Sequence, residues 1–201
     1  MKHRKELFMT SYQITEWCHR MIRDFVSPGD LCIDATMGNG HDTAFLSSLA
    51  GNEGEVLAFD IQEIALSNTR KRLKNENCPA NTTLFLESHT EIGKHASPGS
   101  VSCITFNFGY LPGGDHAKAT RPETSLAAVK AALPLLKTGG LLSLCIYSGQ
   151  DTGFEERDTL LQFLQTLDPK SYLVLKTDYF NRPNHPPIPV FVIRQEVKSS
   201  L

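Results

Sequence analysis

Three groups of polar residues in this sequence have types and spacings that could bind a small molecule and act on it. The segment Asp34–Thr43, DATMGNGHDT, places two glycines between an acid and a predicted helix. A second acid, Asp60, closes the apolar run 56–60, and the segment NFGY runs from Asn107 to Tyr110. Glycines allow a ligand to approach the backbone, carboxylates accept from hydroxyl and ammonium groups, and an amide oxygen accepts from an amine. These residues therefore predict a ligand site that can position an amine.

The glycines lie in a predicted strand-to-helix turn. The apolar run 30–34 is typical of a strand, and residues 42–50 have the apolar spacing of a helix that stops at Gly51. Gly38 and Gly40 can take positive φ, and the free amides at the start of the helix favour electronegative ligand atoms. The pattern indicates a nucleotide-like ligand.

The two acids distinguish between classes of ligand. Thr43 stands where the dinucleotide-binding fingerprint has its third glycine, and Asp34 would repel a diphosphate. A carboxylate at that place suits a cationic ligand with an ammonium group, as in S-adenosylmethionine, and Asp60 is placed to accept from two ribose hydroxyls. We therefore predict S-adenosylmethionine as the cofactor. The predicted cofactor-binding residues are Asp34, Thr36, Met37, Gly38, Asn39, Gly40, His41, Asp42, Thr43, Asp60, Gln62, His89 and Asn107.

The NFGY segment is similar to the Asn-Pro-Pro-Tyr block of methyltransferases that act on exocyclic amines. A carbonyl of Asn107 at a strand end can accept an N–H from the target amine, and Tyr110 can stack on a base. These two are the predicted catalytic residues. Because an ammonium cannot attack, the target must lose a proton, and His89, Asp115 and His116 are all candidate acceptors.

Alternating strands and helices predict an α/β fold with a doubly wound, Rossmann-like sheet. We expect one domain over residues 1–201 with a seven-stranded, mostly parallel sheet whose last strand is antiparallel, because the final two strands are joined by a short Pro-rich connection without a helix. The predicted strands are 31–34, 55–60, 82–87, 101–107, 141–147, 172–179 and 189–194. The predicted helices are 10–26 at the N-terminus, packed on the sheet, then 42–50, 63–75, 122–137 with a kink at Pro134, and 154–167.

This topology predicts where the polar residues meet. Ligands of open α/β sheets bind beyond the carboxyl ends of the strands, so Asp34, Asp60, His89 and Asn107 are expected to converge on one edge of the sheet.

Three segments resemble the signature blocks of the YtqB/MnmM family, which is also described as a family of rRNA methylases. They are DATMGNGHDT at 34–43, FDIQ at 59–62 and FNFGYLPGG at 106–114, and the resemblance extends from about residue 30 to residue 193. The resemblance implies a class I S-adenosylmethionine-dependent methyltransferase. It also implies N-methylation of the aminomethyl group of 5-aminomethyl-2-thiouridine at the tRNA wobble position, with the anticodon stem-loop as the bound partner.

One block departs from the family's pattern. The family's fifth strand usually runs into Tyr-His-Gly-His, whereas this chain has Tyr147, Ser148, Gly149 and Gln150. Neutral hydrogen-bonding side chains therefore replace two imidazoles, which bears on the substrate rather than on the cofactor. A methyltransferase for rRNA or a small amine is the alternative reading, and a nicotinamide-dependent oxidoreductase is a more remote one.

Composition sets further limits. The chain has 201 residues, of which 40% are hydrophobic and 21% charged, as is ordinary for a globular domain. The N-terminus lacks a signal-like apolar stretch and no run suits a membrane span, so we expect a cytoplasmic protein. No His, Cys or acid cluster has metal-ligand spacing, so no metal is predicted. The five cysteines, expected as reduced thiols, are Cys18, Cys32, Cys78, Cys103 and Cys145. The sequence is compatible with a monomer and with a homodimer.

The net charge of −2 argues against a protein that coats nucleic acid without specificity. Any contact with RNA phosphates must be local. The run 70–74 is expected to form the solvent-exposed face of a helix. The candidate contacts are Lys2, Arg4, Lys5, Arg20, Arg23, the run 70–74, Lys118 and Arg121.

Overall fold

The computed structural model describes residues 13–109, 120–148 and 150–196. Its seven strands form one sheet in the order β3-β2-β1-β4-β5-β7-β6. Strand β7 is antiparallel to both β5 and β6, and the pairs among β1 to β5 are parallel. The strands are β1 (Leu31–Asp34), β2 (Glu55–Asp60), β3 (Thr82–Leu86), β4 (Val101–Phe108), β5 (Leu136–Ile146), β6 (Tyr172–Lys176) and β7 (Ile188–Arg194). The predicted α/β fold class, with its antiparallel last strand, is confirmed.

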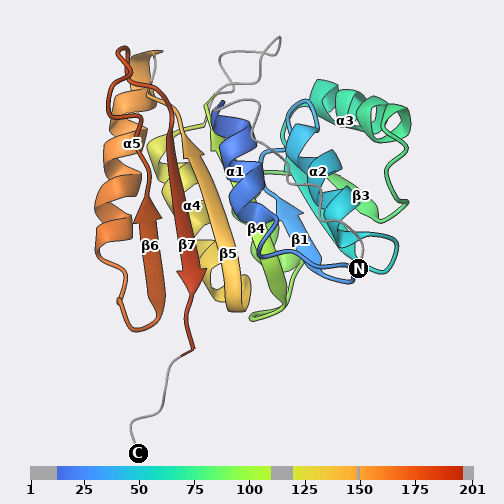
Figure 1. The fold of residues 1–201 in the computed structure, drawn as a ribbon. Coiled ribbons are helices and arrows are strands. Elements are labelled where there is room, and N and C mark those ends of the chain that lie inside the picture. Colours follow the sequence, from blue (N-terminus) through green and yellow to red (C-terminus); the bar gives the residue numbers. More distant parts are fainter. Residues whose placement is uncertain (1–12, 110–119, 149, 197–201) are drawn as a thin grey trace, which may run out of the picture.

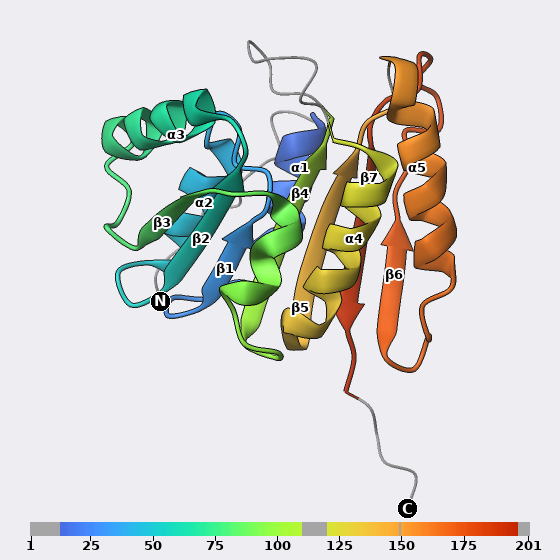
Figure 2. The same cartoon turned by 180° about the vertical axis from the view of Figure 1, so that it is seen from behind.

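Helices cover both faces of the sheet (Figures 1 and 2). Helices α1, α2 and α3 lie on one face, and α4, α5 and the 3-10 helix η1 lie on the other. The helices are α1 (Ile14–Ile22), α2 (His41–Ala50), α3 (Glu63–Asn75), η1 (His89–Lys94), α4 (Pro122–Ala132), η3 (Leu133–Leu135) and α5 (Gln150–Gln165).

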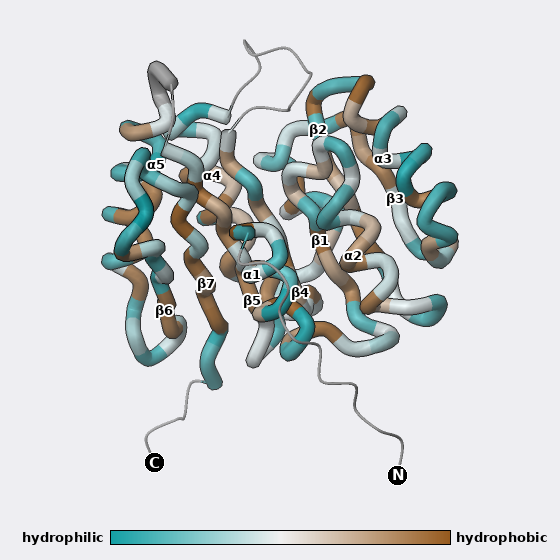
Figure 3. The backbone as a smooth tube through the Cα atoms, turned by 45° about the horizontal axis from the view of Figure 1, so that its top comes forward, coloured by the Kyte–Doolittle hydropathy of each residue, from teal (hydrophilic) through white to brown (hydrophobic). Residues whose placement is uncertain are grey.

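The strands are apolar on both faces because both faces are covered. In β4, Ile104, Phe106 and Phe108 belong to the core layer under α4 and α5, whereas Cys103 belongs to the layer under α1 and α2. Figure 3 shows the hydrophobic strands inside and hydrophilic outer turns on α3 and α5. Since side chains alternate along a strand, Asn107 points to the α1 and α2 side.

Helix α1 packs on the sheet as predicted, through Cys18 and Ile22, but its end differs. The helix ends at Ile22 rather than near residue 26, because the amides of Asp24 and Phe25 bond to carbonyls only three residues back. The predicted start near residue 10 lies outside the described residues.

The largest correction concerns the segment 122–140. Helix α4 ends at Ala132, and Pro134, which has no backbone N–H, lies in η3 instead of kinking a longer helix. The glycines at 139 and 140 form an irregular register inside β5, which already begins at Leu136. A Cβ at Gly140 would lie 2.9 Å from two carbonyl oxygens, so this crossing requires glycine.

Other boundaries move less. Strand β6 ends at Lys176 rather than at residue 179, and α5 covers 150–165 rather than 154–167. The remaining strands and helices begin and end within one residue of the predicted positions. Within the described ranges, no helix is both long and apolar enough to cross a lipid bilayer. The described cysteines are all free thiols.

Candidate active site

Asp60, at the end of β2, shapes the glycine turn that follows β1. Its Oδ2 accepts the N–H of Gly38 at 3.1 Å, and its Oδ1 accepts the N–H of Gln62 at 2.9 Å. Burial raises the pKa of Asp60, and the two hydrogen bonds oppose that rise. The residue is partly exposed, and each carboxylate oxygen has a second lone pair for a ligand hydroxyl. This arrangement fits the predicted contact with the two hydroxyls of a ribose.

Gly40 brings α3 into contact with the turn. The residue has a φ of +77°, and a Cβ there would lie 2.8 Å from the Thr69 Oγ1 and 2.9 Å from the Thr69 Cα. The hydroxyl of Thr69 donates to the Gly38 carbonyl at 3.3 Å. Only glycine combines this backbone conformation with this close approach. Thr69 of α3 therefore packs directly against the turn and holds its position.

Arg72 of α3 anchors the same turn. Its Nε donates to the carbonyl of Asn39 at 2.7 Å, and its Nη2 lies 2.8 Å from the His41 Nε2. Burial, and then the charge of Arg72, lower the pKa of His41. The run 70–74 is thus not only an exposed charged face, because Arg72 points inward. Nothing in the spacing of that run distinguishes Arg72 from its neighbours.

Asp34 lies inside the turn and is fully buried. Its Oδ2 accepts the hydroxyl of Thr43 at 2.6 Å, and its Oδ1 accepts the N–H of Thr36 at 3.2 Å. Burial, followed by the neighbouring charge of Asp42, raises the pKa of Asp34 to about 7. In this structure the carboxyl braces the turn, and a direct contact with a ligand ammonium stays a prediction. Met37 and Gln62, also predicted to bind cofactor, are both buried.

Asn107, at the end of β4, is held at two points. Its backbone N–H donates to the Thr36 Oγ1 at 2.7 Å, and its side-chain Nδ2 donates to the Asp42 Oδ2 at 2.7 Å. With the nitrogen end of the amide fixed on Asp42, the side-chain oxygen is the end left to accept from a ligand. Thr36 therefore links Asp34 and Asn107, which were predicted to converge.

His19 of α1 extends this network, and no pattern in the sequence indicated this role for it. Its Nε2 lies 2.6 Å from the Asp42 Oδ1, and its ring stacks on Phe45 at a centroid distance of 3.8 Å. Burial works to raise the pKa of Asp42, but the hydrogen bonds from His19 and Asn107 outweigh it and lower the pKa. An ionised carboxylate therefore stands directly behind Asn107 at neutral pH.

His89 lies on the other side of β4 from Asn107. Its ring meets the edges or faces of Phe106 and Phe108 at centroid distances of 6.1 and 6.4 Å, in the core layer under α4. Burial lowers the pKa of His89 to about 4, against a backbone hydrogen bond with Thr124, and its Nε2 is buried without a hydrogen-bond partner among the described residues. Such a weak base on that face is poorly placed to take a proton at Asn107.

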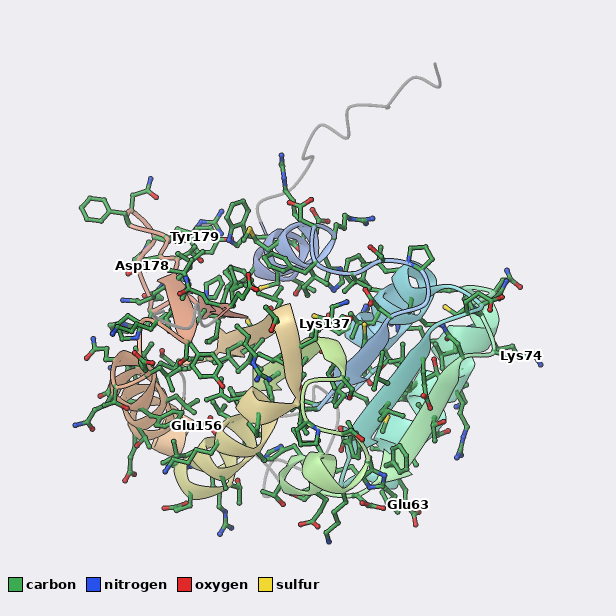
Figure 4. All side chains as sticks on the ribbon, turned by 90° about the horizontal axis from the view of Figure 1, so that it is seen from below. Glu63, Lys74, Lys137, Glu156, Asp178 and Tyr179 are labelled. Carbon is green, nitrogen blue, oxygen red and sulfur yellow. The ribbon has the colours of Figure 1, made fainter. Side chains whose placement is uncertain are left out.

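Glu156 of α5 and Thr120 form a hydrogen-bond network with Gly109, just after β4. Gly109 donates its N–H to the Thr120 Oγ1 at 2.9 Å, and Thr120 returns its own N–H to the Gly109 carbonyl at 3.1 Å. Glu156, labelled in Figure 4, accepts from the hydroxyls of Thr120 at 3.0 Å and Ser125 at 2.5 Å. Burial raises the pKa of Glu156. These contacts tie Gly109, two residues after Asn107, to Thr120 and to α5.

Several residues predicted to contact cofactor, substrate or RNA lie apart from this site or outside the described ranges. Of the described cations, Arg20, Arg23 and Arg121 are exposed, and the guanidinium of Arg23 lies 5.0 Å above the Phe45 ring. The hydroxyl of Ser148 is buried without a partner among the described residues. Among those residues, no group of three or more His, Cys, Asp or Glu side chains could hold a metal ion. The predicted residues outside the described ranges are Tyr110, Asp115, His116, Lys118, Lys2, Arg4 and Lys5.

Comparison with known proteins gives consistent matches. A family model described as "Putative rRNA methylase" matches residues 56–193. The chain is 35% identical to the tRNA (mnm(5)s(2)U34)-methyltransferase, chloroplastic, of Arabidopsis thaliana, over 90% of this chain and 69% of that protein.

Two solved structures have the same fold. An rRNA methylase structure from Clostridium thermocellum has a TM-score of 0.88 and 44% identity, covering 92% of this chain and 100% of that chain. A methyltransferase from Streptococcus mutans, solved in complex with SAH, has a TM-score of 0.82 and 36% identity, covering 92% and 99%. On the match of the family model and the identity to these relatives, the chain belongs to the rRNA methylase family.

Proposed function

We propose that this protein methylates the aminomethyl nitrogen of 5-aminomethyl-2-thiouridine at the wobble position of tRNA. The chain is an S-adenosylmethionine-dependent methyltransferase, as its family and its similar structures establish. The finer assignment to a tRNA wobble base is supported by the 35% identity to a relative named for that reaction.

The observation that carries the proposal is the double anchoring of Asn107. Its amide N–H group is committed to Asp42 and its backbone N–H to Thr36, so its carbonyl oxygen is the acceptor available to an amine. An N–H bond to that oxygen would direct the nitrogen lone pair along a fixed line. Orientation of this kind supplies up to about 7–11 kcal/mol of barrier reduction for well-aligned reactants.

The residues of the glycine turn fit the adenosyl group of the cofactor. Asp60 is partly exposed with free acceptor capacity, and Gly38, with a φ of +50°, carries no side chain on the turn. When bound, S-adenosylmethionine supplies a methyl carbon on a sulfonium, which accepts the nitrogen electron pair as the carbon–sulfur bond breaks.

Asp42 assists through charge. The attacking nitrogen gains positive charge as the new carbon–nitrogen bond forms. The ionised carboxylate of Asp42, one hydrogen bond behind Asn107, stabilises that charge, and His19 holds the carboxylate in place. The substrate ammonium must lose a proton before it attacks. His89 is not the proposed acceptor of that proton, because burial lowers the pKa of its imidazole to about 4.

The test uses purified protein, S-adenosylmethionine and tRNA isolated from a strain in which this gene is deleted. We expect nucleoside mass spectrometry to show loss of the aminomethyl nucleoside and gain of its methylaminomethyl product. Ribosomal RNA and small amines from the same strain serve as competing substrates. Methyl incorporation only into rRNA or a small amine would show that the tRNA assignment is wrong.

A further inference from the structure

A cavity of about 230 Å³ lies between α1 and the segment that follows β6. It is lined by Trp17, Thr177, Asp178, Tyr179 and Pro189. Figure 4 shows Asp178 and Tyr179 on that segment, beside α1. None of these residues takes part in the cofactor turn or in the contacts of Asn107 described above.

The sheet places this cavity on the same edge as the active site. In the strand register Asn107 lies opposite Cys145, Cys145 lies opposite Pro189, and the N–H of Thr177 donates to the Pro189 carbonyl at 2.9 Å. Neighbouring strands are ~4.8 Å apart, so Pro189 is about 10 Å from Asn107 along this edge. Because β6 runs in the same direction as β4, residues 177–179 leave the sheet at the edge where Asn107 lies.

The lining has the chemistry that binds an unstacked base. Trp17 and Tyr179 offer aromatic surfaces, and the guanidinium of Arg182 lies 4.4 Å above the Tyr179 ring. Aromatic side chains and planar Arg groups are the surfaces on which proteins stack single-stranded bases. The carboxylate of Asp178 can accept from an exocyclic amino group or a ring N–H of such a base.

We propose that this cavity binds a nucleobase of the RNA substrate that neighbours the methylated base. The proposal rests on the proposed function, because it names a second contact with the same RNA. A base that enters the site at Asn107 must leave its stack, so its neighbours lose a stacking partner. An aromatic cavity about 10 Å along the edge replaces that partner and continues the active site towards β6.

The chain contains one tryptophan, Trp17, so its fluorescence reports directly on the cavity. The full-length protein is first saturated with S-adenosylhomocysteine to fill the cofactor site. It is then titrated with an RNA stem-loop whose loop has the anticodon-loop sequence. Stacking of a base on Trp17 is expected to quench its emission with a saturable dependence on RNA concentration.

Two variants of neighbouring aromatic residues make a matched pair. Tyr179→Ala removes a wall of the cavity and should weaken RNA binding on the order of tenfold, as loss of one base-stacking contact does. Phe180→Ala removes a fully exposed ring that does not line the cavity, and it should leave RNA affinity unchanged. Neither change should alter the affinity for S-adenosylhomocysteine, and Tyr179→Phe should retain the stacking.

Methylation of aminomethyl-bearing tRNA is measured on the same samples, so the two proposals fail in different ways. If methylation is intact but the fluorescence does not respond and the two alanine variants bind alike, the base-binding cavity is wrong and the function stands. If the fluorescence responds but no methyl is transferred to tRNA, the proposed function is wrong and the cavity remains a base-binding site. Absence of both responses overturns both.

Discussion

The two halves of the sheet hold their polar residues in different ways. Around β1 and β2 the contacts fix backbone: Asp60 binds the Gly38 amide, and Arg72 binds the Asn39 carbonyl. At the end of β4, by contrast, a chain of side chains from different elements holds Asn107, through Asp42 to His19 of α1.

This difference indicates how the protein binds its cofactor, at the turn between β1 and α2, and how it positions its substrate, at Asn107. The turn of the cofactor half has its shape set by glycines and backbone bonds, so it is formed before any ligand arrives. The substrate half depends on α1 docking correctly, because His19 reaches Asp42 only from that helix. Substitutions in the first half should therefore change binding, and substitutions in the second half should change turnover.

Asn107→Ala is expected to separate turnover from cofactor binding most clearly. Loss of the oriented carbonyl should lower kcat on the order of a hundredfold, as misplacement near the reacting atoms does. The affinity for S-adenosylmethionine should change little, because Asp60 and the glycine turn remain. Single-turnover methylation and calorimetric titration measure the two quantities. Unchanged turnover would mean that Asn107 does not orient the amine.

The opposite result is expected from Asp60→Ala. A hydrogen bond to a charged acceptor contributes ~1.5–3 kcal/mol, so the affinity for S-adenosylmethionine should fall about 10- to 100-fold. Asp60→Asn, which preserves the shape of the side chain, should lose less. If calorimetry finds equal affinity for the alanine variant and the wild-type protein, the placement of the ribose at Asp60 is wrong.

His19→Phe probes the link to α1. The phenyl ring can keep the stack on Phe45 but cannot hold Asp42, so kcat should fall about tenfold, by the loss of one hydrogen bond to a charged group. KM for the cofactor should stay the same. A variant with full turnover, or one that is defective only in thermal stability, would reduce His19 to a packing residue.

Two glycines with nearly the same positive φ allow a comparison of how tightly the backbone is packed at Gly40 and at Gly139. Gly40 has a φ of +77° and Gly139 a φ of +78°, so alanine at either position incurs similar strain. Only at Gly40 would the new methyl also meet Thr69, whereas nothing lies within 4 Å at Gly139. Gly40→Ala should therefore be less stable than Gly139→Ala by about 1–3 kcal/mol in urea unfolding. Equal losses would mean that α3 yields at this contact.

Asp34 predicts a pH dependence of stability inside the cofactor half. Its pKa is raised to about 7, so the native state keeps a proton that the unfolded chain loses near pH 4. Its contribution to stability is present below pH 4 and is lost as the pH rises towards 7, with a slope of at most about 1.4 kcal/mol per pH unit. Asp34→Asn should flatten the curve of unfolding free energy in this window. An unaltered slope would show that Asp34 is ionised throughout.

Local patterns accounted for much of the fold. The bounds of β1 and β2 match the prediction because each is a short apolar run that ends at an acid. The bounds of α3 also match, although that helix is mostly polar. The segment 122–140 did not match the prediction. Pro134 lies in η3 rather than in a longer helix, and the glycines at 139 and 140 lie within β5 instead of ending that helix. The place of these glycines depends on how β5 pairs with β4, which the local sequence does not show. The family, the fold and the cofactor were predicted correctly, whereas the site residues and the tRNA base stay predictions.

The sequence by itself determined which kinds of side chain stand at the strand ends: glycines, acids and an amide. This is possible because strand ends and turns are recognised from neighbouring residues in the chain. Only the tertiary structure decided which groups act together. It buried Asp34, turned Arg72 inward, moved His89 to the far face of β4 and joined His19 to Asn107 through Asp42. These outcomes depend on how helices dock on the sheet, and a contact between residues so far apart in the chain leaves no local pattern.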